Sequence, residues 1–187
     1  MDGMKREEAW ELLCEYTKTD ALRRHAVSVE TVMRAGARKY GSDEETWGLV
    51  GLLHDFDYEQ FPDEHPMKGK GILEERGVPA EIVYAIQCHA DFSGYERRSM
   101  MDKMIFAVDE LTGFVIACAL VRPNKSLAGL EPSSVRKKLR DKAFARTVIR
   151  DDIWKGMEEL GVDFDEHVGF VVESLKPVAS EIGLSNT

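Results

Sequence analysis

Four histidines and two aspartates have the side-chain types of a metal site: His25, His54, Asp55, His65, His89 and Asp109. Neutral imidazoles and carboxylates bind divalent transition metals such as Fe, Mn, Ni, Co and Zn. Six such groups are more than one tetrahedral site requires, whereas two ions that share a carboxylate would use them all. The sequence therefore points to one or two divalent metals per chain and to chemistry in which a metal activates water.

The hydrophobic context of these residues supports this interpretation. Asp109 follows the run MIFAV at 104–108, which leaves it little room to face water. A buried, unpaired carboxylate costs several kcal/mol, so Asp109 must be protonated, paired or bound to a metal. His25 lies in line with Leu22 and Val29 on an apolar helix face. Taken alone, His25 would be better explained as a buried ring hydrogen-bonded to backbone, but its five companions favour a ligand.

The elements that position these residues are predicted to be helices. Apolar residues recur at helical spacing almost throughout, and the alternation of half-buried strands is hardly seen, so we expect an all-α, compact multi-helix bundle. Gly41 is a predicted left-handed cap, and Ser42 with Glu45 a predicted capping box for the helix that ends at His54-Asp55. The predicted helices cover about residues 5–17, 21–40, 42–55, 66–77, 79 through His89, 100–121, 133–145, 151–160 and 165–182.

The order and spacing of the six residues resemble the HD superfamily of metal-dependent phosphohydrolases, over roughly residues 20–125. The pattern of that superfamily is a His, a later His-Asp pair and a distal Asp on a long helix, which here are His25, His54-Asp55 and Asp109. His65, within HPMKGKG, and His89, within AIQCHAD, are similar to the extended H-HD-H-H-D pattern of dinuclear members such as the HDIG group. The resemblance implies an HD-domain bundle.

The resemblance also implies ligand sets and a reaction. The two sets share Asp55 as a bridge: His25, His54, Asp55 and Asp109 for one metal ion, and Asp55, His65 and His89 for the other. The implied reaction is hydrolysis of a phosphate ester or anhydride of a small phosphorylated compound, most naturally a nucleotide, by a metal-activated water. Mg joins the transition metals as a candidate cofactor.

The residues after the HD pair depart from the pattern of several dinuclear members, which place a Lys there. This chain reads HDFDYE, so Asp57 and Glu59 join Asp55 as candidate catalytic groups, with proton transfer as their expected role. The GYP signature of cyclic-dinucleotide phosphodiesterases is absent from the sequence.

Several basic residues are candidates for binding a substrate phosphate, although solvated surface charge is the more common role for each alone. They are Arg122 and Lys125, after the Asp109 helix, and Lys68, after His65. The basic run at 136–142 lacks interleaved aromatic residues, which favours a solvated helix face over a nucleotide or nucleic-acid site. His167, between acidic residues, is assigned to the surface, and Cys88 to the core.

Composition narrows the function class. A net charge of −9 repels nucleic-acid backbones, so binding to nucleic acid is not expected. The N-terminus has no signal-peptide pattern and no span is both long and uncharged enough for a membrane, so we expect a cytoplasmic protein without a membrane partner. The three cysteines are widely spaced and are read as reduced thiols. The length fits a single domain over residues 1–187, with a metal-site core at about 20–125 and C-terminal helices at 132–184 packed on it.

Two alternatives remain open at this point. One is an enzyme with a single metal on His25, His54, Asp55 and Asp109. The other is a non-catalytic, nucleotide-sensing or regulatory HD module with a structural metal, since ligands alone do not prove turnover. A homodimer is compatible with either.

Overall fold

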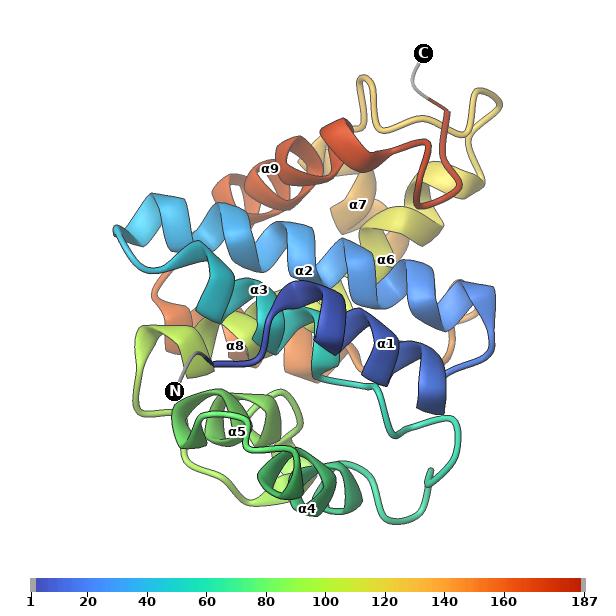
Figure 1. The fold of residues 1–187 in the computed structure, drawn as a ribbon. Coiled ribbons are helices and arrows are strands. Elements are labelled where there is room, and N and C mark those ends of the chain that lie inside the picture. The colour runs from blue at the N-terminus through green and yellow to red at the C-terminus, as the bar shows by residue number, and fades with distance from the viewer. Residues whose placement is uncertain (1–2, 186–187) are drawn as a thin grey trace.

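The computed structural model describes residues 3–185 and confirms an all-α architecture for that part of the chain. No strand occurs within those residues; their regular structure is helical (Figure 1). The α-helices are α1 (Arg6–Tyr16), α2 (Asp20–Tyr40), α3 (Glu44–Leu53), α4 (Met67–Glu75), α5 (Ala80–Gln87), α6 (Met100–Leu120), α7 (Pro132–Leu139), α8 (Arg150–Leu160) and α9 (Phe164–Leu175).

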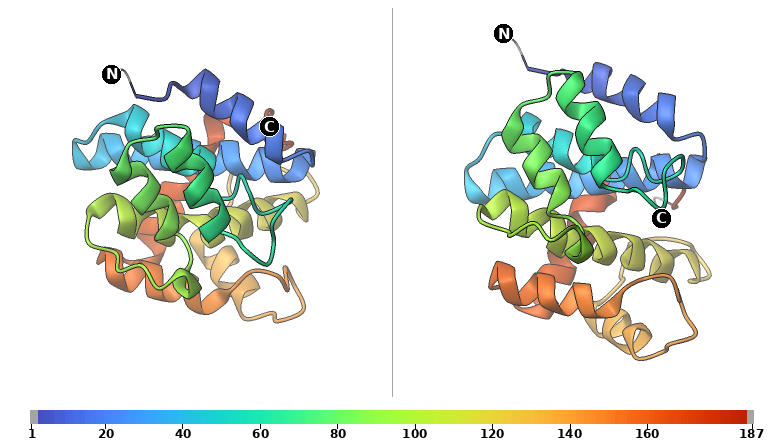
Figure 2. Two further views of the ribbon diagram at one scale, coloured as in Figure 1. Left: turned by 60° about the horizontal axis from the view of Figure 1, so that its bottom comes forward. Right: turned by 90° about the horizontal axis from the view of Figure 1, so that it is seen from below.

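Helices α2 and α6, of 21 residues each, form the centre of the bundle. Helix α3 packs along α2, α8 packs along α6, and α9 contacts both central helices. Helix α1 covers α3, and α4 and α5 lie together at the edge opposite α9 (Figures 1 and 2). Because it is covered by α2, α5, α8 and α9, the apolar helix α6 is buried over most of its length. Within the described chain, no helix has the length and apolar character to span a membrane.

The join between α2 and α3 is partly as predicted. Gly41 has a φ of 66° and caps α2 in the left-handed region, as expected. The predicted capping box of Ser42 and Glu45 is wrong, because the N-cap of α3 is Asp43, whose side chain accepts a hydrogen bond from the backbone N–H of Thr46 at 2.8 Å. The Glu45 carboxylate instead accepts from the Arg34 guanidinium at 2.7 and 3.0 Å, which draws it away from the helix start.

Three predicted helices are shorter than expected. Helix α5 ends at Gln87, so His89 lies just beyond it rather than on it. Helix α7 ends at Leu139, because the segment that follows directs its backbone carbonyls at the Arg150 side chain. Helix α9 ends at Leu175 and is followed by a short 3₁₀ turn that contains Pro177, which has no backbone N–H to continue the α-helix.

The assignment of His167 to the surface is wrong. Its side chain is 2% exposed, and ring Nε2 donates a hydrogen bond to the carbonyl of Ala107 on α6 at 3.0 Å. The ring lies on the face of α9 that also carries Phe164 and Val171, both buried. His167 therefore ties α9 to the central helix, and burial lowers the pKa of its imidazole.

The burial of His167 predicts a pH dependence of stability. Below about pH 6.5 the imidazole of the unfolded chain takes up a proton, whereas the buried ring with its lowered pKa stays neutral. The unfolded state then binds more protons, so the free energy of unfolding falls as the pH falls through 6.5 towards the folded-state pKa. In His167→Gln, whose amide can still donate to Ala107, we expect this loss to shrink by up to about 1 kcal/mol between pH 7 and pH 5.5. Urea unfolding of both proteins with a chelator present measures the difference, and parallel pH profiles would contradict the assignment.

Candidate metal centre

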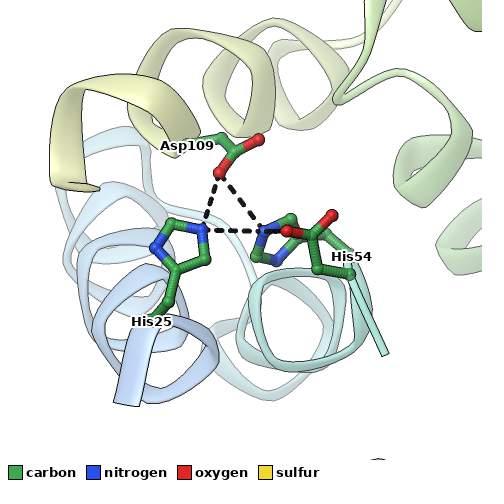
Figure 3. A group of neighbouring side chains, drawn as sticks. His25, His54 and Asp109 are labelled. Carbon is green, nitrogen blue, oxygen red and sulfur yellow. Dashed lines mark hydrogen bonds and ion pairs between the residues drawn. The ribbon is translucent and has the colours of Figure 1, made fainter. Parts of the chain in front are cut away.

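The first cluster joins the two central helices to the end of α3. His25 projects from α2, His54 follows the last residue of α3, and Asp109 lies on α6, and the three side chains point towards one another (Figure 3). Asp109 Oδ1 is 2.9 Å from His25 Nε2 and 3.3 Å from His54 Nε2, and the two Nε2 atoms are 3.3 Å apart. These short distances bring three potential ligand atoms to one point.

Asp55 connects this cluster to a second one. Its Oδ2 atom lies 3.5 Å from His54 Nε2, while its Oδ1 atom lies 3.2 Å from His65 Nε2 and 3.3 Å from His89 Nε2. The Nε2 atoms of His65 and His89 are 3.0 Å apart. In each of the two groups, the potential ligand atoms all lie within 4.8 Å of one another. One carboxylate thus offers a different oxygen to each group.

The outer ring nitrogens of three histidines are fixed by acceptors. His54 Nδ1 donates to the carbonyl of Gly51 at 2.7 Å, and His89 Nδ1 donates to the carbonyl of Ile86 at 2.6 Å. A carbonyl can only accept, so the proton of the neutral ring sits on Nδ1 and Nε2 keeps its lone pair. His65 Nδ1 is held in the same way by the carboxylate of Asp57 at 2.6 Å. All three rings therefore present Nε2 to the centre, as histidine ligands of metals do.

Asp57 has a different place from the one expected for a proton-transfer group. It is 1% exposed and does not line the cavity. Its second oxygen accepts from the backbone N–H of Gly69 at 2.6 Å, and a Cβ at Gly69 would lie 2.8 Å from the Asp57 carboxyl carbon. Glycine is required there for α4 to approach this carboxylate. Asp57 therefore positions His65 and does not face a substrate.

Removing this support should weaken metal binding. We expect Asp57→Ala to lower metal affinity by about 10- to 100-fold, the usual effect of losing the group that orients a histidine ligand. The exposed carboxylate of Glu64, in the same loop, gives a matched control in Glu64→Ala. Competition with a chromophoric chelator measures both affinities, and circular dichroism checks that the variants fold. An affinity equal to that of the parent protein in Asp57→Ala would mean that His65 is not a ligand.

The electrostatics of the two groups favour a bound cation. Burial lowers the pKa of His65, but its hydrogen bonds to Asp55 and Asp57 outweigh this effect and raise the pKa to about 9. Burial likewise opposes protonation of His54, yet the carboxylates of Asp55 and Asp109 hold its pKa well above the ordinary value. Burial would raise the pKa of both carboxyls, but the neighbouring imidazoles lower it. A metal ion at this centre competes with protons for Nε2 atoms, so its affinity rises with pH.

The centre opens into a cavity of about 350 Å³. Five ligand candidates, all but the buried His54, line one part of it, and the remainder comes from the loop after α3, from the turn after His89, from α6 and from the C-terminal region. The lining residues are His25, Asp55, Tyr58, His65, His89, Ala90, Phe92, Asp109, Glu110, Gly113, Thr147, Val148, Ile149 and Asp152. The cavity is large enough for a small molecule next to the centre.

Two acidic residues of this wall were not identified as site residues from the sequence. Glu110 follows Asp109 directly, and burial together with the Asp109 charge raises its pKa to about 7. The position of Glu110 within an apolar helix was the sequence signal that could have identified it as a site residue. Asp152 lies in the first turn of α8, and burial raises its pKa. No local pattern marks Asp152, since only the packing of α8 against α6 brings it to the cavity.

The predicted phosphate-binding residues Arg122 and Lys125 lie elsewhere. Both are beyond the C-terminal end of α6, more than three helical turns from Asp109. The Arg122 guanidinium is occupied by backbone carbonyls of the following loop, including that of Ala128 at 2.8 Å. Neither residue lines the cavity, so the structure does not bring them to the centre.

The remaining two candidates also point away. Lys68 Nζ lies over the ring of Phe61, 5.3 Å from its centroid, and does not line the cavity. The Glu59 carboxylate accepts from the backbone N–H groups of Lys18 and Thr19 at 2.7 and 3.1 Å, where it supports the start of α2 instead of the reaction site. The basic stretch 136–142 lies outside the lining as well.

Cys88 is fully buried, and burial raises the pKa of its thiol to about 12, which agrees with its prediction as a core residue.

Comparison with known proteins finds a match to one family model. The model of the HD domain matches residues 22–113, a stretch that contains all six ligand candidates. No curated protein and no solved structure matches the chain significantly.

Proposed function

We propose that this protein belongs to the HD-domain family, whose model matches residues 22–113, and is a metal-dependent phosphohydrolase of a small phosphorylated compound, with nucleotides as the favoured substrates. HD domains are generally metal-dependent phosphohydrolases. The observation that carries the proposal is the position of Asp55, whose two carboxylate oxygens face two groups of histidines beside an open cavity.

The residues present fit a divalent metal in kind and in position. The donors are imidazole Nε2 atoms and carboxylate oxygens, which suit Fe, Mn, Co, Ni and Zn. The first ion would be held by His25, His54, Asp55 and Asp109, and the second by Asp55, His65 and His89. A bound divalent ion lowers the pKa of a water ligand and neutralises charge on phosphoryl oxygens.

The protein itself orients the histidine rings and provides the space for the substrate. The acceptors on the outer nitrogens of His54, His65 and His89 hold the three rings in one orientation, so little reorganisation is needed when a substrate enters. The cavity has room for the phosphoryl group beside the centre and for the organic part of the substrate in the remaining space. In the reaction, a water oxygen bonds to phosphorus, the bond from phosphorus to the leaving oxygen breaks, and that oxygen takes up a proton.

The proposal is tested on protein purified without a chelator. Metal content is measured per chain, and phosphate release is then assayed on nucleotides and simple phosphoesters with Mn, Fe, Co, Ni or Mg added. Metal-dependent release supports the proposal. Binding of a nucleotide without release under every metal condition would instead favour a sensing or regulatory module.

The number of ions has its own prediction. In the double variant His65→Ala, His89→Ala, we expect the metal content to fall from about two to about one per chain, because only the second group is dismantled. The double variant His25→Ala, Asp109→Ala is the counterpart for the first group. If the parent protein carries only one ion per chain, and the His65→Ala, His89→Ala variant carries the same amount, the single-metal alternative is correct.

A further inference from the structure

The cavity beside the candidate metal centre contains more carboxyl groups than the ligand candidates account for. Besides Asp55 and Asp109, its wall contains the carboxylates of Glu110 and Asp152. In the described part of the chain, no lysine or arginine lines this cavity. This composition is unusual for a pocket that receives phosphates, because Arg and Lys are the common partners of phosphate oxygens.

Two cationic side chains that contact α8 or lie on it, Arg97 and Lys155, are already engaged in ion pairs. Arg97 donates to Glu159 at 2.6 and 2.9 Å and to Asp91 at 2.5 Å, and Lys155 donates to Asp91 at 2.6 Å. Both residues line a separate depression on the outer side of α8. Turning either cation towards the cavity would break these pairs.

Arg150 is engaged even more completely. It precedes Asp152 at the start of α8, and its guanidinium donates to five backbone carbonyls at 2.5 to 3.4 Å, those of Leu139, Asp141, Phe144, Ala145 and Val148. These bonds hold the segment that supplies Thr147 and Val148 to the wall. Arg150 therefore shapes the cavity and has no donor left for a substrate.

The other end of the cavity is aromatic. The rings of Tyr58 and Phe92 lie 5.5 and 6.5 Å from the ring of His65, and these side chains are 46% and 71% exposed. An exposed aromatic pair beside a reaction centre offers a surface for a planar or apolar group. The cavity thus has an aromatic end beside His65 and a carboxylate end beside Asp109.

We propose that this pocket selects phosphate monoesters over compounds with a second phosphate attached to the first, such as nucleoside diphosphates and triphosphates. The inference rests on the proposed function and specifies its substrate class. Metal ions bound at the centre would compensate one phosphoryl group, but a second would meet the carboxyl groups of Glu110 and Asp152 in a cavity wall that no lysine or arginine of the described residues lines. The same carboxylates accept hydrogen bonds from hydroxyl or amino groups, so the organic part carries such donors, as a nucleoside does.

The first test compares AMP, ADP and ATP as substrates of the metal-loaded protein. Free metal is held constant with a metal buffer, because the longer phosphate chains bind metal themselves. We expect kcat/KM for AMP to exceed that for ADP and for ATP by about tenfold or more, since like charges in a partly buried site strongly oppose binding. Equal or faster release from ATP would overturn the inference and leave the proposed function intact.

Matched variants identify the residues responsible. Glu110→Gln combined with Asp152→Asn removes both carboxyl groups and keeps side-chain size, and the glutamine can still accept from the backbone N–H of Ile149. We expect the preference for AMP to fall towards unity, mainly through a lower KM for ADP and ATP. Asp151→Asn, at the exposed neighbouring position, is the control and should retain the parental preference. An unchanged preference in the double variant would also overturn the inference.

Calorimetry gives a readout that does not require turnover. Binding of AMP and ATP to the metal-loaded parent and double variant reports selection even if no phosphate is released. Tighter binding of AMP than of ATP to the parent, lost in the double variant, supports the inference. Absence of release from every substrate, together with this binding pattern, would contradict the proposed function but not the selectivity.

Discussion

Asp55→Ala is expected to lower metal-dependent phosphate release by about 1,000-fold or more. The reason is that this single carboxylate contributes to both groups of potential ligands, with Oδ2 near His54 and Oδ1 near His65 and His89. A loss of several kcal/mol of transition-state stabilisation, as expected when a catalytic metal is misplaced, corresponds to about this factor. Metal content per chain should fall in parallel, and both quantities can be measured on the same preparation.

Two comparisons make this result specific. Asp63→Ala removes an exposed aspartate from the loop that follows and should leave release and metal content at the parental level. Asp55→Ala should also retain the helical circular dichroism of the parent, because Asp55 lies after the end of α3 and supports no helix. Release within a few fold of the parental rate would rule out Asp55 as the shared ligand.

Gly51→Ala is expected to destabilise the protein by about 3 kcal/mol, at the upper end of the range for overpacking. A Cβ at this position would lie 2.7 Å from Glu30 Cα and 2.8 Å from the carbonyl oxygen of Val29. These are backbone atoms of α2, so no side chain can move aside, and α3 must separate from α2. Urea unfolding of the metal-free protein measures the change.

Gly71→Ala is the matched control for this effect. Gly71 lies in the exposed part of α4, and a Cβ there would meet no atom within 4 Å. Alanine is the better helix former, so this variant should be more stable than the parent by about 0.5 to 1 kcal/mol. If both variants changed stability equally, the close approach of α2 and α3 would not be the cause.

The effect of Gly51→Ala should extend to the metal centre. The carbonyl of Gly51 accepts the proton of His54 Nδ1 at 2.7 Å, so a shift of α3 moves the acceptor that orients this ring. Among the folded molecules of this variant we therefore expect weaker metal binding than in Gly71→Ala. The packing of two helices and the orientation of a candidate ligand depend here on the same residue.

The features that were predictable from the sequence are those that depend on local pattern. Helical periodicity predicted the α-helices, and the buried setting of Asp109 in an apolar run indicated that it needs a partner, which the structure supplies in His25 and His54. The six ligand candidates lie together because each stands on an inward helix face or just beyond a helix end. Their roles as ligands remain a proposal, although their convergence is a structural fact.

The features that escaped prediction depend on contacts between distant segments or on competition between neighbours. Asp57 resembled a proton-transfer group by its place after Asp55, and only the fold shows its bonds to His65 and Gly69. His167 was assigned to the surface from its charged neighbours, although its spacing from Phe164 and Val171 follows the buried face of α9. In that case the helical period was a better guide than the adjacent residues.

The hydrogen bonds of Arg150 have a consequence for how this protein can change. The ligand candidates all fall within residues 22–113, whereas Thr147, Val148, Ile149 and Asp152 come from a later stretch whose path Arg150 determines. The ligand candidates and Glu110 therefore come from one part of the chain, whereas Asp152 and the rest of that wall come from another. We therefore expect substitutions in the later stretch to change which compounds enter the cavity while the ligand candidates are preserved, which makes it the natural region to randomise when the protein is engineered for new substrates.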